Sequence, residues 1–218
     1  MLRTACIRLD VKVEQSKQLS VLREVYADAC NRLVSVVCEH RIWNRVGLHN
    51  MVYRDLREHT PLGSQMCCNV IFSVCKAYKS QKERGHIHKA KAVPTIRFNG
   101  TSVHFDKKTY SLRDNSLSLY TLNGRIRVPM IIGEHQQRML SSGHPKEAEL
   151  VFRKGLWFFN LVVEITDTTM VVSEKTMGVD MGENNLAAHS LGKLFGGEQL
   201  RDERDRHLAL RRRLQSNG

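Results

Sequence analysis

The sequence predicts an α+β fold, in which a helical bundle is inserted into a β-barrel and a smaller α/β domain follows. The prediction rests on the period of the apolar residues, which is two in residues 3–13, three to four in residues 16–85, and two again in residues 94–165. A polar stretch then precedes a last block of short strands. The helical block therefore lies between the first strand and the rest of the barrel.

The first half of the chain contains one strand and three helices. Residues 3–13 alternate apolar and polar side chains, which is typical of a half-buried strand. Apolar residues then recur every three or four positions over residues 16–40, with Ser16 as the expected N-cap. A weaker helix is expected at 46–57 and a third at 64–85. Three helices with short connections indicate a small bundle.

From Pro94 onward the pattern is almost entirely that of short strands and tight turns, and it predicts a barrel or a sandwich. Lys154-Gly155 is a turn signal within EAELVFRKGLWFFNLVVEI, which predicts a hairpin. Trp157, Phe158 and Phe159 are expected to pack in this hairpin and the core rather than to stack on bases. The expected strands cover residues 94–98, 102–105, 109–113, 116–121, 124–132, 147–154 and 157–165.

The last block begins after the polar stretch 166–175. TMGVDMG is expected to form a short buried strand, and LAAHSLG and KLFGGEQL two more, before a basic helix at about 201–214. Three hairpin-connected strands followed by a helix are how an RNase H-like domain begins. The predicted domains are a barrel at 1–14 and 88–172, a helical insert at 15–87, and a truncated α/β domain at 173–218.

The charge balance favours a polyanionic partner. Lys and Arg number 34 against 22 Asp and Glu, a formal net charge of +12. Binding phosphates would release condensed counterions, so DNA or RNA is the expected partner. The simpler alternative is that the basic surface only keeps the protein soluble.

The cysteines and the N-terminus indicate a cytoplasmic protein without a membrane partner. None of the six cysteines forms a C-x-x-C pair, and most lie in apolar helical stretches, as buried reduced thiols do. MLRTACIRLDVKVEQ has no apolar core long enough for a signal peptide, and no stretch of the sequence is apolar enough to span a membrane.

The strongest chemical motif is GVDMGENNLA. A carboxylate at the end of a strand, followed by Gly in a turn, places Asp180 at the rim of a sheet, where a divalent metal can bind oxygen ligands. Cleavage with two metals needs several such carboxylates around ions about 4 Å apart. Alternatively, Asp180 only shapes a hairpin turn, or the motif is the first phosphate loop of an actin- or Hsp70-like ATPase.

GVDMGENNLAAHS resembles the first RuvC motif, G-I/V-D-x-G-x-x-N-L-A, of TnpB (OrfB), a transposon-encoded family of RNA-guided DNA nucleases, and of the related type V CRISPR effectors. Other segments agree in order. RTACIRLDV is similar to the family's first strand, ADACNRLVSVV to its first helix, LGSQMCCNVIFSVCKAYKS to its third helix, KEAELVFRKGLWFFNLVVEI to the hairpin before RuvC, and DERDRHLALRRRLQS to the Arg-rich helix after it. The resemblance covers essentially the whole chain and implies an OB/WED-like barrel, a REC-like helical insert and a RuvC start.

The resemblance also implies an activity. In this family the protein reads a short DNA motif, and a transposon-derived guide RNA directs cleavage of double-stranded DNA. Asp180 matches the first catalytic aspartate and Mg²⁺ ligand. The later catalytic Glu and Asp and the zinc module of four cysteines have no counterpart here, and Glu183 lies in the turn and cannot replace them. The chain alone is therefore expected not to cut DNA, unless a separately encoded C-terminal part completes it; a nuclease-dead regulator and a gene remnant are the alternatives.

Basic side chains gather where the helical insert meets the barrel, which in the family lies near guide RNA and target DNA. KAYKSQKERGHIHKAKAVPTIRF contains Glu83 as its only acid. The cations of this segment, and those of an arginine run near residue 212, either contact phosphates or are only solvated. Tyr78 either stacks on a base or packs inside the protein. The predicted nucleic-acid-binding residues are Lys76, Lys79, Lys82, Arg84, Lys89, Lys91, Arg97, Arg211, Arg212 and Arg213.

His86-Ile87-His88 and Tyr110 suggest another chemistry. Single-strand transposases bind metal through a His-hydrophobic-His pair and attack DNA with a tyrosine. Their histidines face the same way on a central strand, whereas no strand pattern surrounds His86 and His88. We therefore assign no role to this motif.

Overall fold

The structure, a computed structural model, describes residues 1–87, 92–166, 176–182 and 185–216. It divides the chain into two compact units, Met1–Asp167 and Thr168–Gly218.

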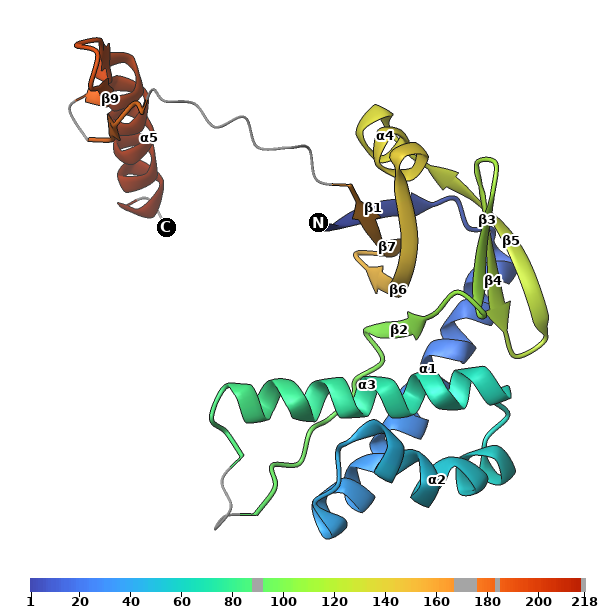
Figure 1. Cartoon of the computed structure of the whole chain (residues 1–218). Helices are drawn as coiled ribbons and strands as arrows, with labels where there is room; N and C mark the ends of the chain where they lie inside the picture. Colours follow the sequence, from blue (N-terminus) through green and yellow to red (C-terminus); the bar gives the residue numbers. More distant parts are fainter. Residues whose placement is uncertain (88–91, 167–175, 183–184, 217–218) are drawn as a thin grey trace. The chain divides into compact units, whose positions relative to one another are not determined.

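The first unit contains the predicted helical block, formed by α1 (Val13–His40), α2 (Arg45–His59) and α3 (Ser64–Glu83) (Figure 1). α1 begins three residues before the expected N-cap, and Ser16 lies inside the helix, where its Oγ accepts a hydrogen bond of 2.9 Å from Trp157 Nε1. The helix ends at His40, and its C-cap Arg41 has a left-handed φ of 54°. Asn44 caps α2, because its side chain accepts a hydrogen bond from the backbone N–H of Gly47.

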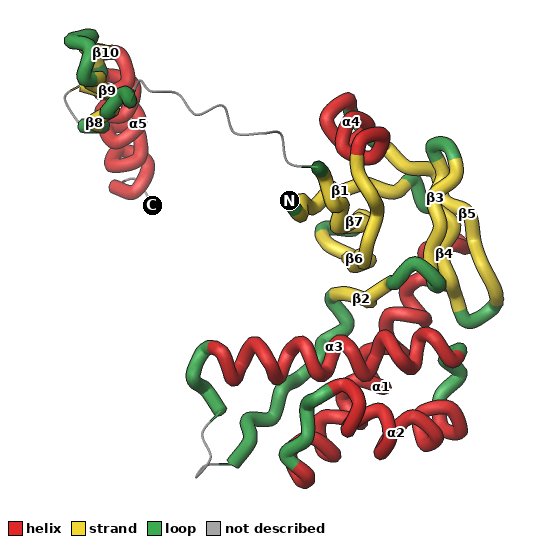
Figure 2. The backbone as a smooth tube through the Cα atoms, viewed as in Figure 1, coloured by secondary structure: helices red, strands yellow, loops and turns green. Residues whose placement is uncertain are grey.

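Seven strands form one antiparallel sheet in the order β2-β6-β7-β1-β5-β4-β3, which curls into a nearly closed barrel (Figure 2). The first strand pairs with β7 on one side and with β5 on the other, which agrees with a helical block inserted after it. Lys154 and Gly155 have φ values of 49° and 75°, so the predicted tight turn joins β6 and β7. The strands are β1 (Leu2–Leu9), β2 (Ser102–Phe105), β3 (Tyr110–Arg113), β4 (Ser116–Thr121), β5 (Gly124–Ile131), β6 (Gly143–Arg153) and β7 (Leu156–Ile165).

Two segments differ from the sequence prediction. Residues 94–98 form no strand, because the side chain of Asn31 on α1 pairs with both the N–H and the C=O of Phe98, each at 2.8 Å. A helix, α4 (Glu134–Ser142), lies between β5 and β6, in a stretch where the sequence analysis expected neither a strand nor a helix. It buries only Met139 among its residues, so it has no apolar periodicity that would reveal it.

One apolar core joins the helices to the sheet. Fully buried side chains from α1, β1, β2 and β7 pack together, among them Leu22, Ile7, Phe105 and Phe159. Tyr26 on α1 donates a hydrogen bond of 2.8 Å to the carbonyl of Asn69 on α3. The first unit is therefore a single packed body, and the position of α3 beside the sheet is fixed.

The second unit consists of a small sheet and one helix. The sheet order is β10-β9-β8, all antiparallel, from β8 (Val179–Asp180), β9 (Asn185–His189) and β10 (Leu194–Gly196), and α5 (Glu198–Ser216) follows. Within this unit Val179 is 54% exposed and Asp180 is exposed, so the burial of the first strand stays a prediction. Three strands and a helix occur in many folds, so the RNase H-like identity stays a prediction.

Candidate nucleic-acid interface

A groove lies between the start of α2 and the C-terminal half of α3. The sequence spacing of three between Lys76, Lys79 and Lys82 places these lysines along one side of α3. The packing of α2 against α3 brings the turn before α2 to the same side. We call this pocket of about 720 Å³ the α3 groove; it is lined by Trp43, Asn44, Arg45, Phe72, Cys75, Lys76, Lys79, Lys82 and Glu83.

Aromatic side chains form the apolar part of the α3 groove. The Trp43 ring stacks on Tyr78, with ring centroids 6.4 Å apart and an interplanar angle of 21°. The Arg45 guanidinium lies over the Phe72 ring at 5.5 Å. Tyr78 itself is fully buried and donates a hydrogen bond to Pro94 O at 3.1 Å, so it packs and does not reach a base. Trp43 was missed from the sequence, because only the fold brings it beside the lysines.

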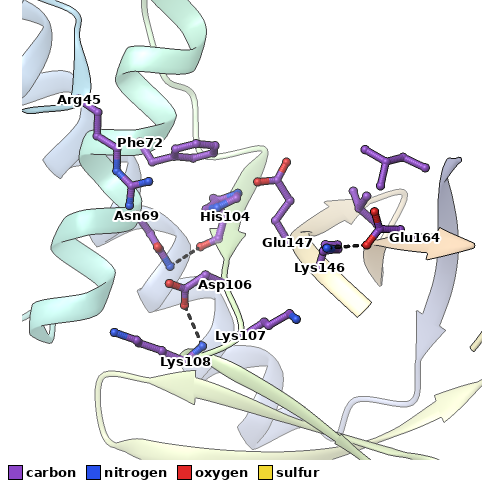
Figure 3. Close-up of a pocket in the computed structure, with 12 residues that line it drawn as sticks. Arg45, Asn69, Phe72, His104, Asp106, Lys107, Lys108, Lys146, Glu147 and Glu164 are labelled. Carbon is purple, nitrogen blue, oxygen red and sulfur yellow. Dashed lines mark hydrogen bonds and ion pairs between the residues drawn. The ribbon is translucent and has the colours of Figure 1, made fainter. Parts of the chain in front are cut away.

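A second pocket, of about 600 Å³, shares Arg45 and Phe72 with the α3 groove and extends it onto the sheet (Figure 3). The His104 ring on β2 packs against Phe72, with centroids 4.6 Å apart and the two rings tilted by 33°. Burial lowers the pKa of His104 below its ordinary value. Further along this pocket, Lys146 pairs with Glu164 at 2.6 Å. The α3 groove is therefore the more basic of the two pockets, because four cations and one carboxylate line it, whereas four cations and three carboxylates line the second pocket.

The lysines of the α3 groove are weakly engaged. Lys76 Nζ lies 3.4 Å from Glu149 Oε1, and Lys79 Nζ lies 3.9 Å from Glu83 Oε1. All four side chains are more than 40% exposed, and exposed ion pairs of this kind contribute roughly 0–1 kcal/mol. In the part of the chain that the structure describes, Lys82 has no ion pair. These ammonium groups can therefore exchange their present partners for phosphate oxygens at little cost.

The other predicted cations do not join the α3 groove. Arg84 is the C-cap of α3 and is exposed. Arg97 lines a separate pocket of about 150 Å³ beside α1. Lys89 and Lys91 lie outside the described residues. Arg211, Arg212 and Arg213 are exposed on α5 of the second unit.

Asp180 is exposed at the end of β8, with Ala188 as its cross-strand partner. Within residues 1–87, 92–166, 176–182 and 185–216, no group of three or more His, Cys, Asp or Glu side chains is placed to hold a metal. Glu183 lies outside these ranges. One carboxylate does not form a two-metal centre, so the described residues do not fit Mg²⁺ by themselves and the metal stays a prediction.

The geometry does not support the transposase-type alternative. His86 follows the end of α3 and its Nδ1 lies 2.6 Å from Gln81 Oε1, while His88 is outside the described residues. Tyr110 is buried and donates its hydroxyl proton to Lys146 O at 2.6 Å. Burial raises the pKa of Tyr110 to about 12, which makes it a poor nucleophile.

The six cysteines are free thiols, as predicted, and only Cys6 is exposed among them. Burial raises the pKa of Cys75 to about 11, so this thiol in the wall of the α3 groove stays protonated. No helix in the described part of the chain is both long and apolar enough to cross a bilayer.

The chain matches no protein-family profile, and no curated protein matches it significantly in sequence. The resemblance to TnpB therefore depends on the motifs quoted above, and the interface depends on the geometry of the α3 groove.

Proposed function

We propose that this protein binds nucleic acid through the α3 groove. The observation that carries the proposal is the placement of Lys76, Lys79 and Lys82 along a groove that also contains Trp43 and Phe72. Cations that follow a backbone and aromatic rings that accept bases are the two components of single-strand recognition. Arg45 adds a guanidinium that lies between the groove and the second pocket.

We further propose that this binding serves a TnpB-like role, with DNA and a transposon-derived guide RNA as the polyanions. The order of the motifs along the chain and the +12 net charge support this proposal. Asp180 would be one Mg²⁺ ligand of a RuvC-like centre, whose other carboxylates the described residues do not supply. We assign no cleavage step to these residues.

The test of binding is fluorescence anisotropy with labelled single-stranded RNA, single-stranded DNA and duplex DNA at several salt concentrations. Replacing Lys76, Lys79 and Lys82 together with alanine should lower affinity for the bound species. It should also reduce the slope of log K against log salt by about 2, because each lost phosphate contact on a single strand contributes about 0.7.

The matched control removes three exposed cations away from the α3 groove, Lys12, Lys17 and Arg113. It lowers the net charge by the same amount, so a general charge effect would weaken both triple variants equally. Equal losses in the two variants would refute a specific role for the α3 groove. Sequencing of RNA that co-purifies with the protein tests the guide-RNA part separately.

A further inference from the structure

The face of β1, β7 and β6 that lies opposite the core is partly exposed, and we call it the outer face. Side chains alternate along β7, so that Trp157 and Phe159 are 3% and 0% exposed in the core. Phe158, Asn160 and Val162 are the alternate residues and lie half-buried on the other face. Trp157 and Phe159 therefore pack in the core, as expected. Phe158 instead lies on the outer face.

Phe158 lies at a basic end of this outer face. In register it is opposite Arg8 on β1 and Val151 on β6. The guanidinium of Arg153 lies over the Phe158 ring at 4.3 Å from the centroid. Arg8 pairs with Phe158 on one side and with Ile131 on the other. The cross-strand partners of Phe158 and Arg8 on the described strands therefore include no carboxylate. An aromatic face flanked by two arginines matches a base and its neighbouring phosphates.

The outer face is continuous with the groove described above. Val162 lines the second pocket, and Val162 and Asn160 line a further pocket of about 230 Å³ together with Lys76 and His104. Phe158 is two residues before Asn160 in β7 and lies on the same face. Alternate residues on a strand are about 7 Å apart. A path of solvent-accessible side chains thus leads from Lys76 along β7 to Phe158.

We propose that this path on β7 carries a single strand of nucleic acid and that Phe158 stacks on one of its bases. The Arg153 guanidinium now occupies the space over the Phe158 ring. In the bound state a base takes that place, and Arg153 turns to a phosphate. An unpaired base is required, since a duplex keeps its base faces stacked internally. The inference rests on the proposed function, because the strand reaches the sheet from the α3 groove.

Carboxylates also border the path and limit where phosphates can lie. Glu147 and Glu149 line the same pocket as Asn160, and Glu149 is paired with Lys76. The phosphates are therefore expected near Arg8 and Arg153, at the far end from these acids.

Cys6 provides a direct readout of occupancy. It is the exposed thiol on β1, it is opposite Asn160 in register, and its Sγ lies 3.7 Å from Arg153 Nη2. N-ethylmaleimide labelling of the full chain, followed by mass spectrometry, measures its accessibility. A labelled single strand of about twenty nucleotides should slow Cys6 alkylation several-fold, whereas a blunt duplex of the same length should not.

Two substitutions test the stacking itself without opening the core. Phe158→Leu keeps an apolar side chain but removes the ring, and should weaken single-strand binding by about 5- to 150-fold, the range for one base–aromatic stack. Phe158→Tyr keeps the ring and should bind like the wild type. Equal affinities for Phe158→Leu and the wild type, or equal protection of Cys6 by duplex and single strand, would overturn the proposal.

The outcome also separates this proposal from the proposed function. If the three-lysine variant loses binding while Phe158→Leu does not and Cys6 stays reactive, the α3 groove binds nucleic acid and the path on β7 is wrong. If the wild-type protein binds no nucleic acid, both proposals fail.

Discussion

Replacing Glu83 with glutamine should make the protein bind nucleic acid more tightly. Among the described residues that line the α3 groove, Glu83 is the only carboxylate, and its Oε1 lies 3.9 Å from Lys79 Nζ. A phosphate that approaches Lys79 is repelled by this carboxylate and competes with it for the ammonium group. Glutamine has nearly the same shape and removes both effects.

The magnitude follows from Coulomb's law and from the exposure of the pair. Two negative charges about 7 Å apart, at an effective dielectric constant of about 60, repel by roughly 0.8 kcal/mol, which corresponds to about a fourfold change in affinity. The side chains of Lys79 and Glu83 are 76% and 65% exposed, so the loss of their ion pair changes the free energy of unfolding by only about 0.5 kcal/mol. The change in binding should therefore be visible against an unchanged fold.

The assay is anisotropy with the same labelled single strand at about 50 and 200 mM salt, where the gain should shrink at the higher salt because of screening. The matched control is Glu14→Gln, which removes one carboxylate from the exposed pair of Glu14 and Lys17 at the start of α1. Unchanged or weaker binding by Glu83→Gln, or an equal gain in the control, would refute the role given to the α3 groove.

Three further predictions concern stability. Asn31→Ala should cost about 2 kcal/mol in urea unfolding, because both backbone groups of Phe98 lose their partner. Gly143→Ala should cost about 1–3 kcal/mol in the same assay, because a Cβ there would overlap the Val163 side chain. Burial lowers the pKa of His104 in the folded protein, so as the pH falls the unfolded chain is protonated at this site before the folded protein is. Protonation therefore favours unfolding, and Tm should fall as the pH drops below about 6.5. The fall should be smaller in His104→Gln.

Each of these variants has a control in an exposed position. Ser35→Ala removes one exposed hydrogen bond to the carbonyl of Arg32 and should leave urea unfolding nearly unchanged. Gly196→Ala places a Cβ in open space and should be tolerated. His135→Gln removes a histidine from an exposed site and is the matched control for His104→Gln. An Asn31→Ala or Gly143→Ala variant as stable as its control would contradict the packing described here, as would an unchanged pH profile in His104→Gln.

Periodicity predicted the parts of the fold that bury one continuous face. The apolar stripe of α1, the alternation in β1 and the Lys154-Gly155 turn are local signals, and the structure contains all three. The lysines of α3 were predicted as part of a longer basic segment, and the helix that contains them then places them along one side.

Tertiary contacts decided what the sequence could not predict. Residues 94–98 alternate like a strand, but Asn31 binds both backbone groups of Phe98 in place of a neighbouring strand. Trp43 is separated by more than 30 residues from the lysines, and only the packing of α2 on α3 places it in the α3 groove. Alternation along a strand already separates Phe158 from Trp157 and Phe159, but only the register of β7 places it opposite Arg8 on β1.

The most direct test of nucleic-acid binding at the α3 groove is to map ultraviolet crosslinks between the wild-type protein and a bound single-stranded RNA by mass spectrometry. The account predicts crosslinked nucleotides on Trp43 and Phe72 and on the peptide that contains Lys76, Lys79 and Lys82. Crosslinks confined to α5, or none in the α3 groove at saturating RNA, would contradict it.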